Sequence, residues 1–401
     1  MAAGSSGSAG PLKLYAGNSW IYVSGDSHQA RWNRFATSFA SVLKSLCEGL
    51  ILYDQVIVPT QDFLLVSGLL GVLGKPALTE LIESGILKFV RLNGTYGYAD
   101  KGLGVVAFKN HINGKESQFC APMERAISEA ITNLPGQAND LALARKIADV
   151  TTEVDAMELE QEIRNEILKD VSRSACLRQH FNMGADLAAR IAELQNDKAE
   201  VRLQFMTDLN DDSVAPEING IVTVLRMNLN LRLASRVGCM DGTSTDPIGY
   251  LIRAKADGVM SAPAASNGFA TLCQIASLPD IGEGVDRGQI KVEELVRLNK
   301  KRSGTQFRKW FHEVCRTDPT SVAKEYVALL HEVPQVQTLP VRIMRFLAIN
   351  AVGLIPGLGP IANLGAGVVD SFFIDSWLKG NSPKYFIDDL RQLAPGQLPK
   401  S

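Results

Sequence analysis

Hydrophobic residues recur alternately at helical and at strand spacing along the first hundred positions of the chain. From Gln29 to Cys47 they fall at every third or fourth position, which predicts an amphipathic helix. The next segment, GLILYDQVIVP from Gly49 to Pro59, is a nearly continuous apolar run, typical of a strand covered on both faces. Two short helices between Asp62 and Glu83, divided at Gly74, precede a second strand, ILKFVRL at 86–92. This order predicts a parallel pair of strands joined by a right-handed crossover.

Turn residues predict two hairpins beside these strands. LKLY and WIYV flank the tetrapeptide Ala16–Ser19, which favours a hairpin with a Gly-Asn turn. A second, glycine-rich hairpin is predicted from Gly94 to Phe108. Beyond about residue 115 helical spacing dominates, apart from one predicted strand at 201–209. The predicted helices are 123–134, 138–150, 155–181, 186–195, 217–236, 248–256, 292–299, 305–315, 321–331 and a last one after Pro383.

These patterns predict an α+β fold that is predominantly α-helical and has four parts. Residues 1–11, rich in Gly and Ser, predict a disordered tail. Residues 12–110 form a small mixed α/β unit, and 115–335 a helical body. Residues 336–401 hold an apolar helical hairpin and the C-terminal helix. A chain of 401 residues is long enough for two or three domains with well-buried cores.

The longest uncharged and largely apolar run lies near the C-terminus, between Arg345 and Asp370. An unbroken helix over this run would be about 36 Å long, enough to cross a bilayer core of about 30 Å. Pro356 and Pro360, with two glycines between them, break such a helix. The run therefore predicts two helices joined at a corner, which we call the apolar hairpin (residues 346–378).

An apolar hairpin of this kind must be covered, and three interpretations follow. It is buried in the core of the helical body, it associates with a membrane, or it docks a protein partner. Aspartates and aromatic residues share its last turns, so that end is amphipathic. The candidate membrane- or partner-binding residues are Phe346, Leu354, Ile355, Leu358, Ile361, Leu364, Phe372, Phe373 and Trp377.

Charge changes this picture little. The net charge of −2 provides no global field that would recruit nucleic acid or anionic lipid. A local basic patch consists of Lys300, Lys301, Arg302, Arg308 and Lys309. Such a patch can bind phosphates, but the aromatic residues interleaved with it favour a solvated turn whose helix faces the core. We therefore expect no nucleic-acid partner.

Six cysteines are scattered without a CxxC pair, which is typical of a reducing compartment. The first residues lack a basic segment followed by an apolar core, so we expect no secretion. A cytoplasmic location is predicted, with association with the inner face of the membrane as an alternative. No spacing of His, Cys, Asp or Glu indicates a metal site, and no motif indicates a cofactor.

Two aspartates are the candidate catalytic residues. Asp54 interrupts the first apolar run, and Asp62 begins the helix after it. The strand–helix–helix–strand order of residues 49–92 resembles the opening of PIN-type nucleases. That resemblance implies carboxylates that converge on a metal ion and cleave a phosphodiester. The alternative is structural, with Asp54 hydrogen-bonded in the core and Asp62 capping a helix.

A second resemblance concerns two segments, LPDIGEGVDRGQIKVEELVRLNKKRSGTQFRKWF at 278–311 and ILYDQVIVPTQDF at 51–63. Both are similar in cadence to stretches of uncharacterised bacterial proteins. The resemblance implies a bacterial origin and brings no activity with it. Because no catalytic group assembles in the sequence, we expect a non-enzymatic intracellular protein that binds through the apolar hairpin, with the metal-dependent nuclease as the alternative.

Overall fold

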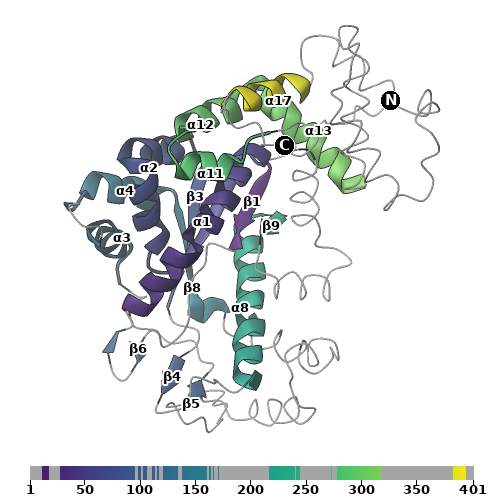
Figure 1. Cartoon of the computed structure of the whole chain (residues 1–401). Coiled ribbons are helices and arrows are strands. Elements are labelled where there is room, and N and C mark those ends of the chain that lie inside the picture. Colours follow the sequence, from purple (N-terminus) through teal and green to yellow (C-terminus); the bar gives the residue numbers. More distant parts are fainter. Residues whose placement is uncertain are drawn as a thin grey trace, which may run out of the picture. The chain divides into compact units, whose positions relative to one another are not determined.

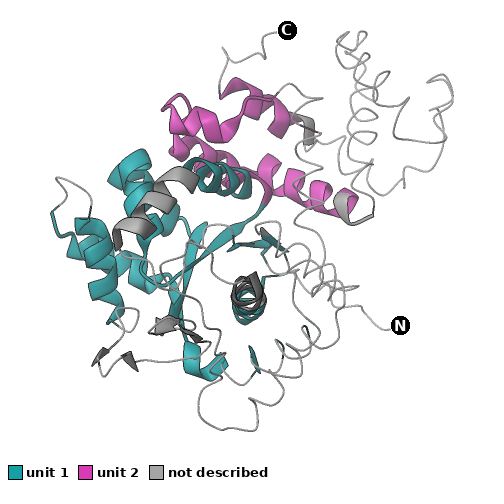
Figure 2. Ribbon diagram, turned by 60° about the horizontal axis from the view of Figure 1, so that its bottom comes forward, with its two compact units in different colours: residues 1–49, 53–260 teal, residues 50–52, 261–401 magenta. Residues whose placement is uncertain are grey.

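The structure of the protein is a computed structural model, which describes part of the chain (Figure 1). The described residues are 11–17, 28–94, 98–100, 103–105, 111–112, 115–116, 121–133, 138–159, 162–163, 166, 170, 216–239, 241–243, 272, 278–317 and 383–393. The chain divides into two compact units, shown in Figure 2. Unit 1 comprises residues 1–49 and 53–260, and unit 2 comprises residues 50–52 and 261–401.

Unit 1 is built on a parallel sheet of five strands in the order β8-β3-β2-β1-β9. The strands are β1 (Lys13–Ala16), β2 (Gln55–Thr60), β3 (Leu87–Asn93), β8 (Thr151–Asp155) and β9 (Asp241–Thr243). All four pairs of neighbouring strands are parallel. The middle strands β2 and β3 are almost completely buried, as expected of a sheet covered on both faces. The predicted parallel pairing of these two strands is confirmed.

Consecutive residues of β1 show which helices cover the two faces of the sheet. Leu14 lies under helix α1 (His28–Leu52), because a Cβ placed on Gly49 would come within 2.9 Å of Leu14 Cδ2. Tyr15 points to the other face, where its hydroxyl donates to Asn230 Oδ1 of α8 (Pro216–Arg236) at 2.7 Å. Side chains alternate between the faces of a strand, so α1 and α8 cover opposite faces.

The crossover between β2 and β3 is helix α2 (Leu64–Glu83). This helix is interrupted at Gly74, where the sequence predicted a division into two helices. Gly74 has non-helical backbone angles (φ 76°, ψ 166°), so the helix is kinked there and resumes before Pro76. Gly85 follows the helix with a positive φ of 74°, which glycine adopts without strain. The crossover from β3 to β8 contains α3 (Met123–Thr132) and α4 (Leu141–Asp149), and both pack on α2.

The prediction of a strand beginning at Gly49 is wrong for its first residues. Gly49–Leu52 continue α1, and the strand begins only at Gln55. The reason is periodicity, because Leu43, Leu46, Cys47 and Leu50 are all buried at the spacing of one helical face. An apolar run of this length is compatible with either structure, and the upstream helix decides it.

The predicted hairpin between LKLY and WIYV is also wrong in its pairing. Both edges of β1 are occupied by parallel strands, β2 on one side and β9 on the other, so no edge remains for an antiparallel partner. The glycine-rich hairpin is confirmed as β4 (Tyr98–Asp100) paired antiparallel with β5 (Leu103–Val105). A further small hairpin joins β6 (His111–Ile112) and β7 (Lys115–Glu116).

Two of the five sheet strands, β8 and β9, lie beyond the segment 12–110 in which we expected the strands of the α/β unit. Helical spacing did not reveal them, since TTEVD and DGT are short and polar. The predicted strand at 201–209 and the predicted helices at 186–195, 248–256 and 321–331 lie outside the described residues. At the coarse level, the mixture of helices and a small parallel sheet, mostly helical among the described residues, agrees with the predicted fold class.

The described part of unit 2 is helical. It contains α11 (Ile281–Asp286), α12 (Val292–Lys300), α13 (Arg302–Thr317) and α17 (Pro383–Gln392). Aromatic rings hold α13 and α17 together, with the centroids of Phe307 and Phe386 only 4.7 Å apart. Gly304 lets α13 start directly after α12, since a Cβ there would collide with the carbonyl oxygen of Leu298. The helices predicted at 292–299, 305–315 and after Pro383 are confirmed.

Candidate ligand-binding site at the carboxyl edge of the sheet

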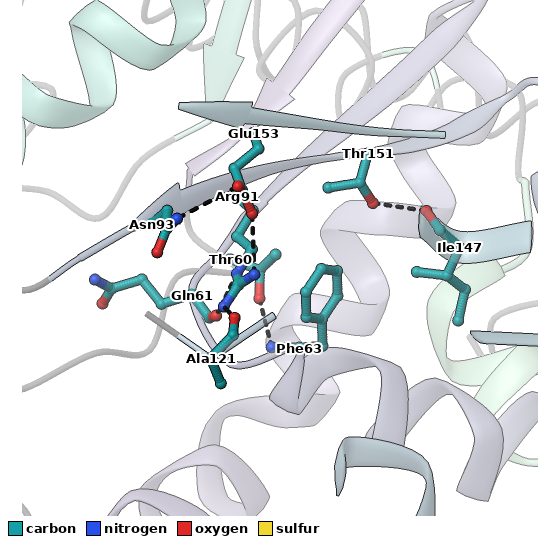
Figure 3. Close-up of polar contacts among 9 residues, drawn as sticks. All are labelled: Thr60, Gln61, Phe63, Arg91, Asn93, Ala121, Ile147, Thr151 and Glu153. Carbon is teal, nitrogen blue, oxygen red and sulfur yellow. Dashed lines mark hydrogen bonds and ion pairs between the residues drawn. The ribbon is translucent and has the colours of Figure 1, made fainter. Parts of the chain in front are cut away.

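Polar side chains gather toward the carboxyl ends of β2 and β3 and on the neighbouring strand β8. Thr60 and Gln61 lie at the end of β2, Arg91 and Asn93 are in the last three residues of β3, and Glu153 is the central residue of β8, in register with Arg91. Because the three strands are parallel neighbours, these residues share one edge of the sheet. Ligands of open α/β sheets bind outside the carboxyl ends of the strands, most often in the crevice at the topological switch point. We call these five residues the sheet-edge site (Figure 3).

Arg91 is the centre of the sheet-edge site. Arg91 is completely buried (0 % exposed), and its guanidinium forms hydrogen bonds to three separate segments of the chain. Nε donates to the carbonyl of Gln61 at 3.2 Å, one terminal nitrogen donates to the carbonyl of Ala121 at 2.6 Å, and the other pairs with Glu153 Oε2 at 3.0 Å. A buried guanidinium is tolerated only when its donors are satisfied in this way. Arg91 therefore ties the ends of β2 and β8 and the segment before α3 into one rigid edge.

The turn after β2 has an unusual backbone. Phe63 adopts φ 56° and ψ 25°, the left-handed region, and no other non-glycine residue in the described segments has a positive φ. Thr60 Oγ1 stabilises the turn by accepting from the Phe63 amide at 2.8 Å. The Phe63 ring is completely buried and lies 5.9 Å from the Arg91 guanidinium carbon. Strained backbone of this kind costs about 1–3 kcal/mol and concentrates at functional sites.

Two amide side chains complete the site. Gln61 is 3 % exposed, and its Nε2 donates to the carbonyl of Gly94 at 2.7 Å. Asn93 Nδ2 donates to Glu153 Oε1 at 3.3 Å. Each amide nitrogen faces an acceptor, which fixes the side-chain orientation and leaves the amide oxygen on the other side. In the described part of the chain, neither Gln61 Oε1 nor Asn93 Oδ1 receives a hydrogen bond.

The two amides come from neighbouring strands. Gln61 follows β2, and its amide nitrogen donates to the carbonyl of Gly94, the residue directly after Asn93. Figure 3 shows both of them on one side of the Arg91 guanidinium, with the Phe63 ring on the other. The sheet-edge site thus contains two oriented but buried acceptor oxygens and the partly exposed carboxylate of Glu153, whose side chain is 36 % exposed.

The topological switch point of the sheet lies between β1 and β9, one strand away from Gln61. There the chain leaves β1 at Ala16 and β9 at Thr243, and the residues after Gly17 and after Thr243 lie outside the described residues. Cys239 precedes β9, and burial raises the pKa of its thiol to about 12, although Lys13 opposes this shift. Lys13 Nζ itself donates to the carbonyl of Val237 at 3.0 Å. These contacts stabilise the start of β9 and add no reactive group.

The two candidate catalytic aspartates do not come together. Asp54 lies in the turn before β2, where its Oδ2 accepts from the Leu12 amide at 2.9 Å. Asp62 lies after β2, where its Oδ1 accepts from the Leu64 amide at 3.2 Å. A strand of six residues separates them, which is about 20 Å at 3.3 Å per residue. They cannot share a metal ion, whose oxygen ligands lie about 2.0–2.6 Å from it.

Nor do other groups supply a metal site among the described residues, where no set of three His, Cys, Asp or Glu side chains is close enough. Asp54 and Asp62 have instead the structural role that the sequence left open. Asp54 fixes the register of β1 beside β2, and Asp62 orders the turn before α2. No described arrangement supports the nuclease alternative.

The basic patch is divided between surface and interior. Lys300, Lys301, Arg302 and Lys309 are exposed, and Lys301 pairs with Asp389 at 2.9 Å. Arg308 is only 3 % exposed and donates to the carbonyl of Asn299 at 3.0 Å, so it is a structural residue and cannot contribute to a surface. The three aromatic residues Phe307, Trp310 and Phe311 face the interior, as the sequence favoured.

The apolar hairpin, residues 346–378, lies outside the described residues, and so do all nine of its candidate binding residues. One described helix, α2, has the length and the hydropathy that a membrane-spanning helix needs, but half of the qualifying window is buried within the protein. α2 is accounted for as the core crossover between β2 and β3.

Sequence reasoning missed the sheet-edge site. The one available signal was Arg91 itself, a charged residue in the middle of the predicted buried strand ILKFVRL. Such a residue must find partners, and these are drawn from segments up to 62 residues away in sequence. Gln61, Asn93 and Glu153 carry no local pattern that would have singled them out.

Comparison of the chain with protein-family models, with curated proteins and with solved structures gave no match. The described fold is an α/β unit with a parallel five-stranded sheet and a second unit whose described residues are helical.

Proposed function

We propose that unit 1 binds a small polar molecule at the sheet-edge site, and that this molecule donates hydrogen bonds. The observation that carries the proposal is the amide oxygen of Gln61, which is enclosed and receives no donor from the described residues. An enclosed acceptor without a donor costs about 1–3 kcal/mol. A ligand that donates to this oxygen recovers that free energy and gains affinity from it.

The rigidity of the edge supports the same proposal. Arg91 holds three segments together, and the donor bonds of Gln61 and Asn93 keep both amide oxygens in fixed directions. A site whose side chains are already ordered loses little further side-chain conformational entropy when it binds a ligand. No nucleophile or base is needed for this role, so the proposed function is binding.

A thermal-unfolding panel with three defined donors tests this proposal. The full chain is heated with ribose, acetamide or putrescine, which offer hydroxyl, amide and ammonium donors. At least one of them is expected to raise the melting temperature of the wild type and to have little effect on Gln61→Met, which lacks the amide oxygen but keeps a similar size and shape.

Gln55→Met is the matched control, because Gln55 lies at the opposite end of the same strand. It should retain the wild-type response. If no compound distinguishes Gln61→Met from the wild type and from the control, the sheet-edge site does not bind donors and the proposal is rejected.

Binding through the apolar hairpin is a second and independent proposal. It is supported by the charge-free run between Arg345 and Asp370, which is the longest in the chain. An apolar segment of this length has to be covered by the protein, by a partner or by lipid. A flotation experiment, given in the Discussion, tests the lipid alternative.

A further inference from the structure

We infer that unit 2 binds the surface of an anionic lipid bilayer through exposed cations at the junction of α12 and α13. The cations that carry this inference are Arg297, Arg302 and Lys309, which we call the basic corner. The inference concerns unit 2 alone, so it does not depend on the ligand proposed for the sheet-edge site of unit 1. It is supported by the exposure of these side chains, by the charges around them and by the burial of the aromatic side chains of α13.

The side chains of the basic corner are accessible. Because α13 begins directly after α12, Arg297 in the last turn of α12 and Arg302 at the start of α13 flank the junction. On α13, Arg302, Thr305 and Lys309 are all exposed and follow one another at intervals of three and four residues, which places them on one face of the helix. Among the described residues, no hydrogen bond or ion pair engages the side chain of any of the three cations.

No acidic residue interrupts the basic corner along the chain. Residues 295–312 contain no Asp or Glu, and the acidic residues that bound this stretch are Glu294 and Glu313. Within the stretch, Arg308 is buried and donates to the carbonyl of Asn299, so its charge belongs to the interior. The exposed cations therefore form a surface of positive potential, which attracts anions.

The helix that packs on α13 does not neutralise this surface. α17 carries two aspartates, and each of them is paired with another cation. Asp389 pairs with Lys301 at 2.9 Å, and Asp388 pairs with Arg391 at 2.9 Å. The three cations of the basic corner take no part in either ion pair, so their charge remains available to a ligand.

Helix stability does not explain the charge of Arg302. A cation in the first turn of a helix is repelled by the positive end of the helix dipole, and acidic residues are preferred there. Arg302 begins α13, whose first turn contains no acidic residue. Arg297 differs, because it lies in the last turn of α12, where a cation is favourable. A charge placed against the local preference is expected where it serves binding.

The aromatic residues of α13 favour lipid over nucleic acid as the partner. Proteins that hold single-stranded nucleic acid combine cations with exposed aromatic rings on which bases stack. Phe307, Trp310 and Phe311 are at most 4 % exposed, so α13 offers no such ring. An anionic bilayer requires only cations within about 10 Å of its surface. The charge-free run of residues 346–369 belongs to the same unit, and a basic surface combined with an apolar segment is typical of stable membrane attachment.

Sedimentation of the full chain with sucrose-loaded vesicles tests the inference at equilibrium. The vesicles consist of phosphatidylcholine alone or of an equal mixture with the anionic lipid phosphatidylglycerol. In about 50 mM NaCl, the chain is expected to bind the anionic vesicles about tenfold or more tightly than the neutral ones. In about 500 mM NaCl most of this difference should disappear, because the Debye length falls to about 4 Å.

Three double variants make the test specific. Arg302→Gln, Lys309→Gln should weaken binding to anionic vesicles about 20-fold, since each basic residue near such a surface contributes about fivefold. Arg302→Lys, Lys309→Arg keeps both charges and should bind as the wild type does. The matched control is Arg145→Gln, Lys146→Gln, which removes one arginine and one lysine from exposed positions of α4 and should also bind as the wild type does.

Several results would overturn the inference. Equal binding to neutral and anionic vesicles would assign membrane binding to the apolar hairpin and leave the basic corner without a role. Wild-type binding by Arg302→Gln, Lys309→Gln would do the same, and an equal loss in the α4 control would mean that only net charge matters. Poly(U) RNA that displaces the chain from anionic vesicles would assign the basic corner to nucleic acid. None of these results bears on the proposed function of unit 1, which is tested by small donors and Gln61→Met.

Discussion

Replacement of Arg91 by methionine tests whether one buried guanidinium holds the edge of the sheet together. The residue is 0 % exposed, and its side chain bonds to the carbonyls of Gln61 and Ala121 and to the Glu153 carboxylate. Methionine fills most of the same volume without a donor. The substitution therefore leaves the carbonyl oxygens of Gln61 and Ala121 without their charged donor. Gln61 is a buried residue, so water cannot easily replace the donor at its carbonyl.

The magnitude follows from these three contacts. A hydrogen bond to a charged group contributes about 1.5–3 kcal/mol, and the lower end of this range applies to Ala121, which is half-buried. The ion pair adds less than about 1 kcal/mol, because the Glu153 side chain is 36 % exposed and water can replace its partner. Arg91→Met should therefore lower the free energy of unfolding by about 3 kcal/mol. Glu153→Gln keeps an acceptor for the guanidinium and should lower it by about 1 kcal/mol.

Urea unfolding of the two variants measures this difference. The chain has two compact units, so hydrogen–deuterium exchange of the peptide that covers β3 is used to follow unit 1 alone. With a denaturant dependence of about 2 kcal/mol per M, Arg91→Met should shift the midpoint by about 1.5 M and Glu153→Gln by about 0.5 M. Arg91→Lys keeps the charge but cannot reach three acceptors at once, and should fall between them.

Two results would refute this reasoning. An unchanged midpoint for Arg91→Met would mean that the guanidinium contributes nothing net, as in proteins where a buried ion pair is replaced by apolar residues without loss. A shift for Glu153→Gln as large as that for Arg91→Met would mean that the ion pair, and not the carbonyl contacts, holds the edge.

Three further predictions concern other parts of the chain. Burial raises the pKa of Cys239 to about 12, so its thiol should react with iodoacetamide at pH 8 far more slowly than the thiol of a cysteine peptide does. Mass spectrometry of the labelled protein measures the rate, and equal rates would contradict the burial. Gly304→Ala places a methyl group against the Leu298 carbonyl, and calorimetric unfolding should show a loss of more than about 2 kcal/mol. If the apolar hairpin binds lipid, the wild type should float with anionic liposomes and a Leu354→Asp, Leu358→Asp variant should not; a wild type that stays at the bottom excludes membrane action.

Local signals in the sequence were sufficient for much of the helical structure and for the central pair of strands. The kink at Gly74 and the turn at Gly85 follow from residues that are themselves conformationally special, so they needed no knowledge of the rest of the fold. The helix at Pro216–Arg236 and the helices α12, α13 and α17 of unit 2 were also predicted, because a buried helical face leaves a periodic pattern within a single segment, whereas the short helix α11 was missed.

The tertiary structure determined those strands, helix ends and site residues that have no local pattern in the sequence. Gly49–Leu52 became helix because they continue the buried face of α1, and TTEVD and DGT became strands because β3 and β1 offered free edges with which to pair. The sheet-edge site arose in the same way. Arg91, Gln61 and Glu153 are up to 92 positions apart, and only the parallel pairing of three strands brings their polar groups to one edge. Residue order sets periodicity along one segment, whereas a site depends on which segments become neighbours, and that is decided by packing of the whole unit.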